Sequence, residues 1–105
     1  YAIQKANEFA IEIPLEVISH CSRIIELSED LIDNGNPNLV SDAGVSAEVS
    51  LAGVRGAAMN VLINLIGIDD DSYCNKKREL VNKFINDAEK NWKIVFDKTM
   101  KKIIS

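Results

Sequence analysis

This chain has few of the residues that most metal-binding and catalytic motifs require. It contains one histidine, and its two cysteines, Cys21 and Cys74, do not form a CxxC or any other metal-ligand spacing. It also lacks a glycine-rich phosphate loop, a Ser/His/Asp arrangement and the interleaved basic and aromatic residues of many nucleic-acid-binding proteins. We therefore expect no metal and no nucleic-acid partner, and a cytoplasmic protein with reduced thiols.

Long hydrophobic runs are absent as well. The longest uncharged run, Gly56 to Ile68, has 13 residues, fewer than the ~20 that a helix needs to cross a bilayer. The N-terminal stretch is amphipathic and charged, unlike a signal peptide. We therefore expect no association with a membrane.

The charge is unevenly distributed. The net charge is −4, but residues 1–72 carry 3 basic and 12 acidic side chains, and residues 73–105 carry 9 basic and 4 acidic ones. This asymmetry argues against a general nucleic-acid binder, whose binding face would be basic. It permits a local anion site near the C-terminal segment.

Apolar residues recur at steps of three and four in three segments, and no segment reads convincingly as a strand. The pattern predicts an all-α fold, a single helical domain over residues 1–105 built as a bundle of long antiparallel helices. The first helix is expected from about residue 2 to 33, with a kink caused by Pro14. Gly35 is expected to end it in the left-handed conformation.

The second helix is expected to start at Ser41 or Asp42, which are both good N-cap residues, and to end near residue 66 or 67. It is rich in alanine, glycine and serine, which allow neighbouring helices to come close. It is therefore predicted to be the central, most enclosed helix, with Gly53, Gly56 and Ala57 covered.

The third helix is expected to follow the acidic residues 69–71 and to reach nearly to the C-terminus. Those acids suit the positive end of a helix dipole, and they lack the alternating spacing of a calcium loop. Lysines lie opposite its apolar stripe, and they most simply form a solvated face: Lys76, Lys83, Lys90 and Lys101. The wide apolar stripe and the small-residue helix together predict self-association.

Asn60 and Asn64 lie one turn apart on an apolar part of the second helix, so they share a face. Either they bond to neighbouring backbone or across a helix contact, or their amides bind a heteroaromatic ligand. Asp42 lies 18 residues before Asn60, which places the two ~27 Å apart along one helix. Asp42 is therefore either only a cap, or it meets another segment or a second subunit.

Glu12, Glu16 and His20 are spaced by four residues and could suggest a metal site. A dedicated site needs three or four convergent ligands, and the chain has no second histidine. An exposed helical face is the better interpretation.

A series of short motifs occurs in the order Ile13-Pro14-Leu15-Glu16-Val17, Gly35-Asn36-Pro37-Asn38, Ser41-Asp42-Ala43-Gly44-Val45, Arg55-Gly56-Ala57, Asn60-Val61 and Asn64-Leu65. With the long Lys- and Glu-bearing terminal helix, this order resembles the cyclodeaminase/cyclohydrolase family of folate enzymes. That family includes formiminotetrahydrofolate cyclodeaminase and a helical methenyltetrahydrofolate cyclohydrolase. The chain is similar to the C-terminal half of the family's domain, because the family's upstream glycine-rich segment is not in it.

The resemblance implies an all-helical homodimer that acts on a tetrahydrofolate derivative, with no cofactor beyond that substrate. The cyclodeaminase closes a ring and releases ammonia, and the cyclohydrolase adds water to the methenyl carbon. In both reactions protons move around a tetrahedral carbon flanked by nitrogens. For proton handling or ligand orientation the matching residue is Asp42. The matching positions for substrate binding are Asn36, Asn38, Ser41, Asn60 and Asn64. The alternative is a non-catalytic helical module for oligomerisation.

Overall fold

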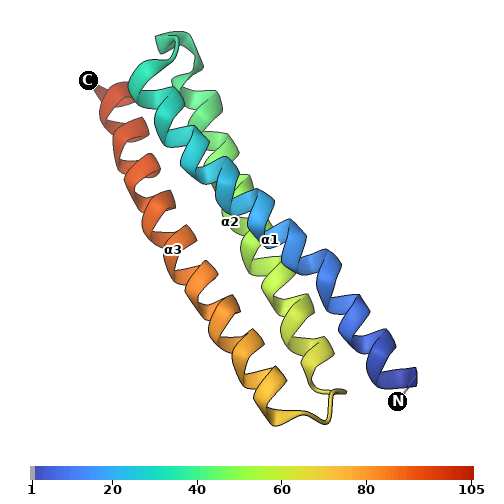
Figure 1. The fold of residues 1–105 in the computed structure, drawn as a ribbon. Coiled ribbons are helices and arrows are strands. Elements are labelled where there is room, and N and C mark those ends of the chain that lie inside the picture. The colour runs from blue at the N-terminus through green and yellow to red at the C-terminus, as the bar shows by residue number, and fades with distance from the viewer. Residues whose placement is uncertain (1) are drawn as a thin grey trace.

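The computed structural model of the protein describes residues 2–105 as three long helices in an up-down-up arrangement (Figure 1). Helix α1 spans Ala2–Asn34, α2 spans Val40–Leu65 and α3 spans Asp71–Ile104. A short 3-10 helix, η1, spans Pro37–Leu39 between α1 and α2. The molecule is a rod of 57 × 17 × 17 Å. There is no strand in residues 2–105, so the predicted all-α antiparallel bundle is confirmed.

The core is built on a seven-residue repeat in every helix. Its fully or nearly fully buried positions are Ile11, Ile18, Ile25 and Ile32 in the first helix, Val40, Ala47, Val54, Val61 and Ile68 in and after the second, and Cys74, Val81, Ala88 and Val95 in the third. With a sustained seven-residue repeat, the buried stripe of each helix faces its neighbours along the whole length when the helices wind around one another with a left-handed twist. This is the packing of helices that cross at a shallow angle of roughly 20°.

Helix α2 is the most enclosed of the three, as its composition predicts. It has ten buried residues in 26, whereas α3 has five in 34. Close approach explains two of its glycines. A Cβ at Gly53 would lie 2.6 Å from Sγ of Cys21 in α1, and a Cβ at Gly44 would lie 2.6 Å from Cγ2 of Thr99 in α3.

The expectation for Gly56 is wrong. Nothing lies within 4 Å of the place where its Cβ would be, so this part of α2 is open. Ala57, one residue further, is buried. Helical spacing identified the small residues, but it could not tell which of them have a helix packed against them.

Two predicted helix ends are also wrong. Gly35 is not left-handed, since no glycine of residues 2–105 has a positive φ, and its N–H donates to the carbonyl of Leu31 at 2.9 Å. Ser41 and Asp42 do not cap α2, because the helix starts at Val40 and its N-cap residue makes no side-chain hydrogen bond. The η1 turn runs directly into α2, so both residues fall in its first turn, where the Asp42 carboxylate suits the positive end of the helix.

The start of α3 is as predicted. Asp70 is the N-cap residue, and its Oδ1 accepts a hydrogen bond of 3.0 Å from the backbone N–H of Tyr73. Asp71 lies in the first turn and Lys101 and Lys102 in the last, so the charges at both ends favour the helix dipole.

Pro14 lies inside α1, and the helix continues without interruption on both sides of it. The kink expected there stays a prediction. None of the three helices, over the described residues, has the length and apolarity of a membrane span.

Candidate functional site

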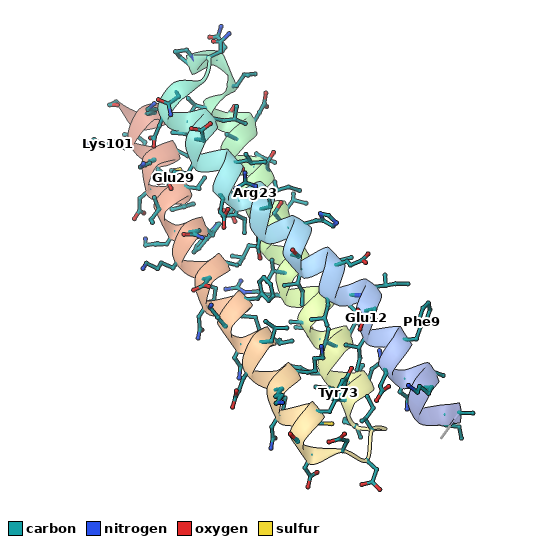
Figure 2. The ribbon with its side chains drawn as sticks, in the orientation of Figure 1. Phe9, Glu12, Arg23, Glu29, Tyr73 and Lys101 are labelled. Carbon is teal, nitrogen blue, oxygen red and sulfur yellow. The ribbon has the colours of Figure 1, made fainter. Side chains whose placement is uncertain are left out.

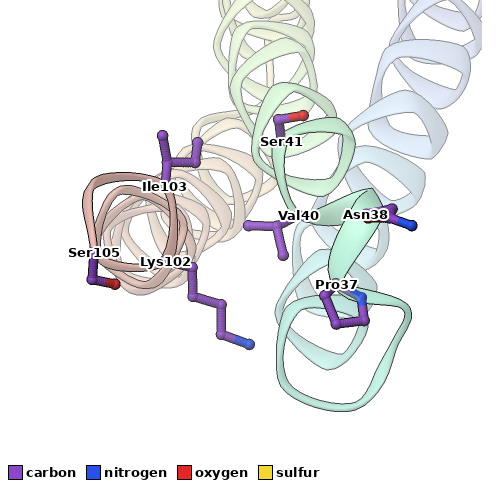
Figure 3. A pocket seen from close by; sticks show the side chains of 7 residues that line it. All are labelled: Pro37, Asn38, Val40, Ser41, Lys102, Ile103 and Ser105. Carbon is purple, nitrogen blue, oxygen red and sulfur yellow. The ribbon is translucent and has the colours of Figure 1, made fainter.

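The end of the bundle that holds the α1–α2 turn contains a hollow of about 520 Å³. It is bordered by the η1 turn and the first residues of α2 on one side and by the last residues of α3 on the other: Pro37, Asn38, Val40, Ser41, Lys102, Ile103 and Ser105. Figure 3 shows Lys102 extending from α3 toward the turn, with Val40 between them. Lys102 is the charged side chain of the lining, and its Nζ donates to the carbonyl of Ile32.

The structure brings the predicted residues of the turn to this hollow. Asn38 and Ser41 line it, and Asn36 and Asp42 are their neighbours in sequence. All four are exposed. Asn36 has a structural role, because its Oδ1 accepts a hydrogen bond of 2.9 Å from the backbone N–H of Asn38 and so caps η1.

Asn60 and Asn64 lie toward the other end of α2. Asn64 is half-buried, and its Nδ2 donates to the backbone carbonyl of Asn60 at 3.0 Å. The side chain of Asn60 is exposed. The hydrogen bond of Asn64 is the local backbone contact that the sequence left open as one alternative, and it leaves the amide oxygen of Asn64 available as an acceptor.

The two sets of predicted site residues are not brought together within one chain. Helix α2 is continuous from Val40 to Leu65, so Asp42 and Asn60 are ~27 Å apart at 1.5 Å per residue. A small ligand cannot contact both sets in a single copy of the molecule.

An apolar cleft of about 190 Å³ between α2 and α3 adjoins the hollow and shares Ser41 and Ile103 with it. Thr99 lines this cleft, and its buried Oγ1 has no hydrogen-bond partner. The hollow and the cleft together offer a polar rim beside an apolar slot, which is the usual composition of a small-molecule site.

Ion pairs fix α3 against α1 near this end. Nζ of Lys98 lies 2.9 Å from Oε2 of Glu29 and 2.8 Å from Oδ2 of Asp33, both on α1. Hydrogen bonds to Asp33 and then to Glu29 raise the pKa of Lys98 above its ordinary value of 10.5. The pair holds the last turns of α3, and so Lys102, beside the turn.

Tyr73 lies at the opposite end of the bundle, near the start of α3, where Figure 2 also shows Glu12 of α1. Burial, followed by the negative charges of Glu8 and Glu12, raises the pKa of Tyr73 above its ordinary value of 10.0. The phenol therefore stays neutral there at physiological pH.

The structure does not assemble a metal site from its described residues. No group of three or more His, Cys, Asp or Glu side chains converges within residues 2–105. Glu12, Glu16 and His20 are exposed on α1, in agreement with their interpretation as a solvent-facing helical surface.

Comparison with known proteins assigns the chain to a family. The family model described as formiminotransferase-cyclodeaminase matches residues 1–83, which is more than half of the chain. The chain belongs to the formiminotransferase-cyclodeaminase family. This agrees with the resemblance carried by the motifs between Ile13 and Leu65.

Individual relatives of this family member carry two names. A methenyltetrahydrofolate cyclohydrolase of Methylorubrum extorquens is 39% identical over 75 residues, which cover 71% of this chain and 36% of that protein. The formimidoyltransferase-cyclodeaminase of Rattus norvegicus is 32% identical over 88 residues, covering 84% of this chain and 16% of that protein. The corresponding protein of Sus scrofa is 29% identical over 97 residues, covering 92% and 18%. The chain thus spans about a third of the length of the bacterial relative and less of the vertebrate ones.

Sequence reasoning missed Lys102 and Ser105 as part of the hollow. Their place depends on the lengths of three helices and on which end of the bundle each one reaches. The available signal was the similar length of the first and third helices, which brings the end of α3 level with the α1–α2 turn.

Proposed function

We propose that this chain is part of a folate one-carbon enzyme, either a formiminotetrahydrofolate cyclodeaminase or a methenyltetrahydrofolate cyclohydrolase. The observation that carries the proposal is its 39% identity to a protein named methenyltetrahydrofolate cyclohydrolase over 71% of the chain. The identity to the cyclodeaminase of Rattus norvegicus is lower, at 32%. Hydrolase activity is therefore the first to assay.

The polar residues suit this chemistry. Both reactions pass through a tetrahedral carbon between two nitrogens. The hydrolase adds water to the methenyl carbon, and the cyclodeaminase forms a carbon–nitrogen bond and expels ammonia. Each step needs a group that accepts and returns a proton, the role that we assign to Asp42. We assign the binding of the pterin ring to Asn60 and Asn64, because their amides can pair with the alternating hydrogen-bond donors and acceptors of the ring.

The cationic end of α3 suits the anionic glutamate tail of a folate. Lys102 lines the hollow and Lys101 precedes it, while Lys76, Lys83 and Lys90 are exposed further along the same helix. Attraction by exposed ammonium groups is screened by salt, so this part of the affinity should fall as ionic strength rises. The proposal includes a cytoplasmic homodimer with no cofactor beyond the folate, no metal and no nucleic-acid partner.

The test for the hydrolase is to add methenyltetrahydrofolate to the purified protein and to monitor the loss of the methenyl absorbance. The test for the cyclodeaminase is to measure the ammonia released from the formimino substrate. Asn60→Ala and Asn64→Ala should each weaken binding by ~1–3 kcal/mol, because a pocket amide or its ligand partner is left unpaired. Asn82→Ala, an exposed asparagine on α3, is the matched control and should bind as the parent does.

The alternative function is a non-catalytic module for helical association. It is favoured by the large number of exposed apolar side chains on α1 and α2. If neither folate binds, and Asn60→Ala and Asn64→Ala change only the melting temperature, the folate proposal is wrong and the alternative replaces it.

A further inference from the structure

The apolar cleft of about 190 Å³ lies between the first turns of α2 and the last turns of α3. Its lining residues are Ser41, Gly44, Val45 and Glu48 on α2, and Phe96, Thr99, Met100 and Ile103 on α3. The α3 residues follow residue 83, where the match to the family model ends. Membership of the family therefore does not define this wall of the cleft, and its chemistry follows from its own side chains.

Thr99 places an unpaired hydroxyl group in this cleft. The residue is 6% exposed, and its Oγ1 is buried without a hydrogen-bond partner among residues 2–105. Ser28 on α1 shows the usual alternative, because its hydroxyl donates to the carbonyl of Ile24, four residues earlier, at 2.8 Å. A buried hydroxyl without a partner destabilises a fold, so most buried hydroxyls are paired. The Thr99 hydroxyl is thus available to a polar group from outside the chain.

Gly44 keeps the space in front of Thr99 free. A Cβ at Gly44 would lie 2.6 Å from Cγ2 and 2.9 Å from Oγ1 of Thr99. Carbon atoms in contact are normally ~3.5–4.0 Å apart, so a larger residue at position 44 would displace the Thr99 side chain. The hydroxyl therefore faces the part of the cleft that the glycine leaves open.

The walls of the cleft suit an aromatic ring. Phe96 and Met100 are 38% and 36% exposed, so a ring that enters the cleft covers apolar surface that otherwise meets water. Aromatic rings pack favourably against both a phenyl group and a thioether. The volume of about 190 Å³ exceeds the ~150 Å³ of an apolar cavity that binds benzene. One six-membered ring therefore fits.

Glu48 places a negative charge at one end of the cleft. Its Oε1 accepts a hydrogen bond of 2.6 Å from Nε1 of Trp92, and it makes no ion pair within residues 2–105. Lys93, the next residue of α3, pairs instead with Asp97 at 3.0 Å. A carboxylate has several acceptor positions, so Glu48 can accept a further hydrogen bond from a cation. This end of the cleft therefore suits an ammonium group.

The two polar groups lie where one ligand can reach both. Gly44, which faces Thr99, is four residues before Glu48, so the hydroxyl and the carboxylate are ~6 Å apart along α2. The whole cleft, from Ser41 to Glu48, is ~10 Å long. A benzene ring with a polar group at each end matches this spacing, with the ring on the apolar side chains.

We propose that the α2–α3 cleft binds a hydroxylated arylalkylamine, a benzene ring that carries a short ammonium arm at one end and a hydroxyl group at the other. The ring packs against Phe96 and Met100, the ammonium group donates to Glu48, and the hydroxyl group pairs with Oγ1 of Thr99. The site borders the hollow through Ser41 and Ile103. It goes beyond the proposed function and does not rest on it.

Three probes of similar size test the site in the full chain. Tyramine has both polar groups, phenethylamine lacks the hydroxyl group and 4-ethylphenol lacks the ammonium group. Isothermal titration calorimetry should show that tyramine binds roughly tenfold more tightly than either of the others, because each missing group leaves a partner unpaired. The emission of Trp92 should change when tyramine binds, since Glu48 holds its indole and its ring lies 5.5 Å from that of Phe96.

Conservative variants assign each polar group. Thr99→Val removes the hydroxyl, so it should bind tyramine and phenethylamine equally, whereas Thr99→Ser should keep the preference for tyramine. Glu48→Gln removes the charge and keeps an acceptor for Trp92, so it should bind tyramine and 4-ethylphenol equally. Glu79→Gln changes an exposed acid of α3 outside the cleft, and as the matched control it should bind as the parent chain does. Because each comparison is between two probes on one variant, a general loss of stability does not imitate it.

The proposal is overturned if tyramine does not bind the folded parent chain or binds it no better than the other two probes. It is also overturned if Thr99→Val keeps the parent's preference for tyramine over phenethylamine. Circular dichroism checks that each variant folds, and if Thr99→Val does not, the parent chain and Glu48→Gln still decide. No folate is present in these titrations, so the cleft and the proposed function fail independently.

Discussion

Gly53 and Gly56 are a matched pair for testing how α2 packs. Both are in the same helix, one turn apart, and both can be changed to alanine. Without other effects each change should stabilise the helix by ~0.8–1.0 kcal/mol, the difference in helix propensity between alanine and glycine. The structure predicts that only Gly56→Ala shows this gain, because nothing lies within 4 Å of its added Cβ.

Gly53→Ala should not show this gain. Its Cβ would lie 2.6 Å from Sγ of Cys21, which is closer than carbon and sulfur atoms pack, so α1 or the cysteine must shift. Inserting a methyl group into a filled space costs roughly 1–3 kcal/mol. After the gain in helix propensity, the variant should be unchanged or less stable by up to ~2 kcal/mol. The two glycine variants should thus differ by the packing cost alone.

Urea unfolding followed by circular dichroism, at the lowest usable protein concentration, measures both variants while association is weakest. A combination of Gly53→Ala with Cys21→Ala serves as the double-mutant control, because it removes the sulfur that the new methyl group meets. The double variant should recover much of the loss. If Gly53→Ala stabilises the chain as much as Gly56→Ala does, the close contact between α1 and α2 is wrong.

Two further predictions concern contacts between helices. The raised pKa of Lys98, caused by Asp33 and Glu29, means that the folded chain holds this proton more tightly than the unfolded one. The stabilisation of the fold by charged Lys98 is complete below pH 10.5 and is lost as the pH rises through the folded pKa. The free energy of unfolding in urea should therefore fall less steeply with alkaline pH in Lys98→Met than in the parent chain. Trp92 is the single tryptophan, and its Nε1 donates to Glu48. Glu48→Ala should destabilise the chain by ~1 kcal/mol and shift the tryptophan fluorescence to longer wavelength, whereas an unchanged emission would refute this contact.

The three helices could be predicted because local periodicity determines them. Each has apolar residues at steps of three and four, and the acids before Tyr73 mark the start of the third. The start of the second helix was harder to predict, because Ser41 and Asp42 are residue types that often cap helices. Pro37 and Asn36 instead form a 3-10 turn, and this turn starts the helix one residue before Ser41.

The candidate site was less predictable because it depends on contacts between distant segments. The turn residues and the asparagines were identified from motifs, but their separation follows from the unbroken course of α2. Lys102 reaches the hollow only because α3 is as long as α1. Such relations follow from helix lengths and topology, which no short motif encodes.

Three features of α2 are unfavourable in an isolated three-helix bundle and favourable in a covered one. Gly56 lowers helix propensity without making a close contact, Met59 and Ile63 are more than 60% exposed, and Asn60 is an exposed polar side chain on an uncharged face. Against a helix packed on this face, the glycine would permit close approach and the apolar side chains would be buried. Asn60 would then lie at the edge of the interface, where a ligand could reach its amide. A covered α2 would thus account for the glycine, the apolar side chains and the absence of charge on this face.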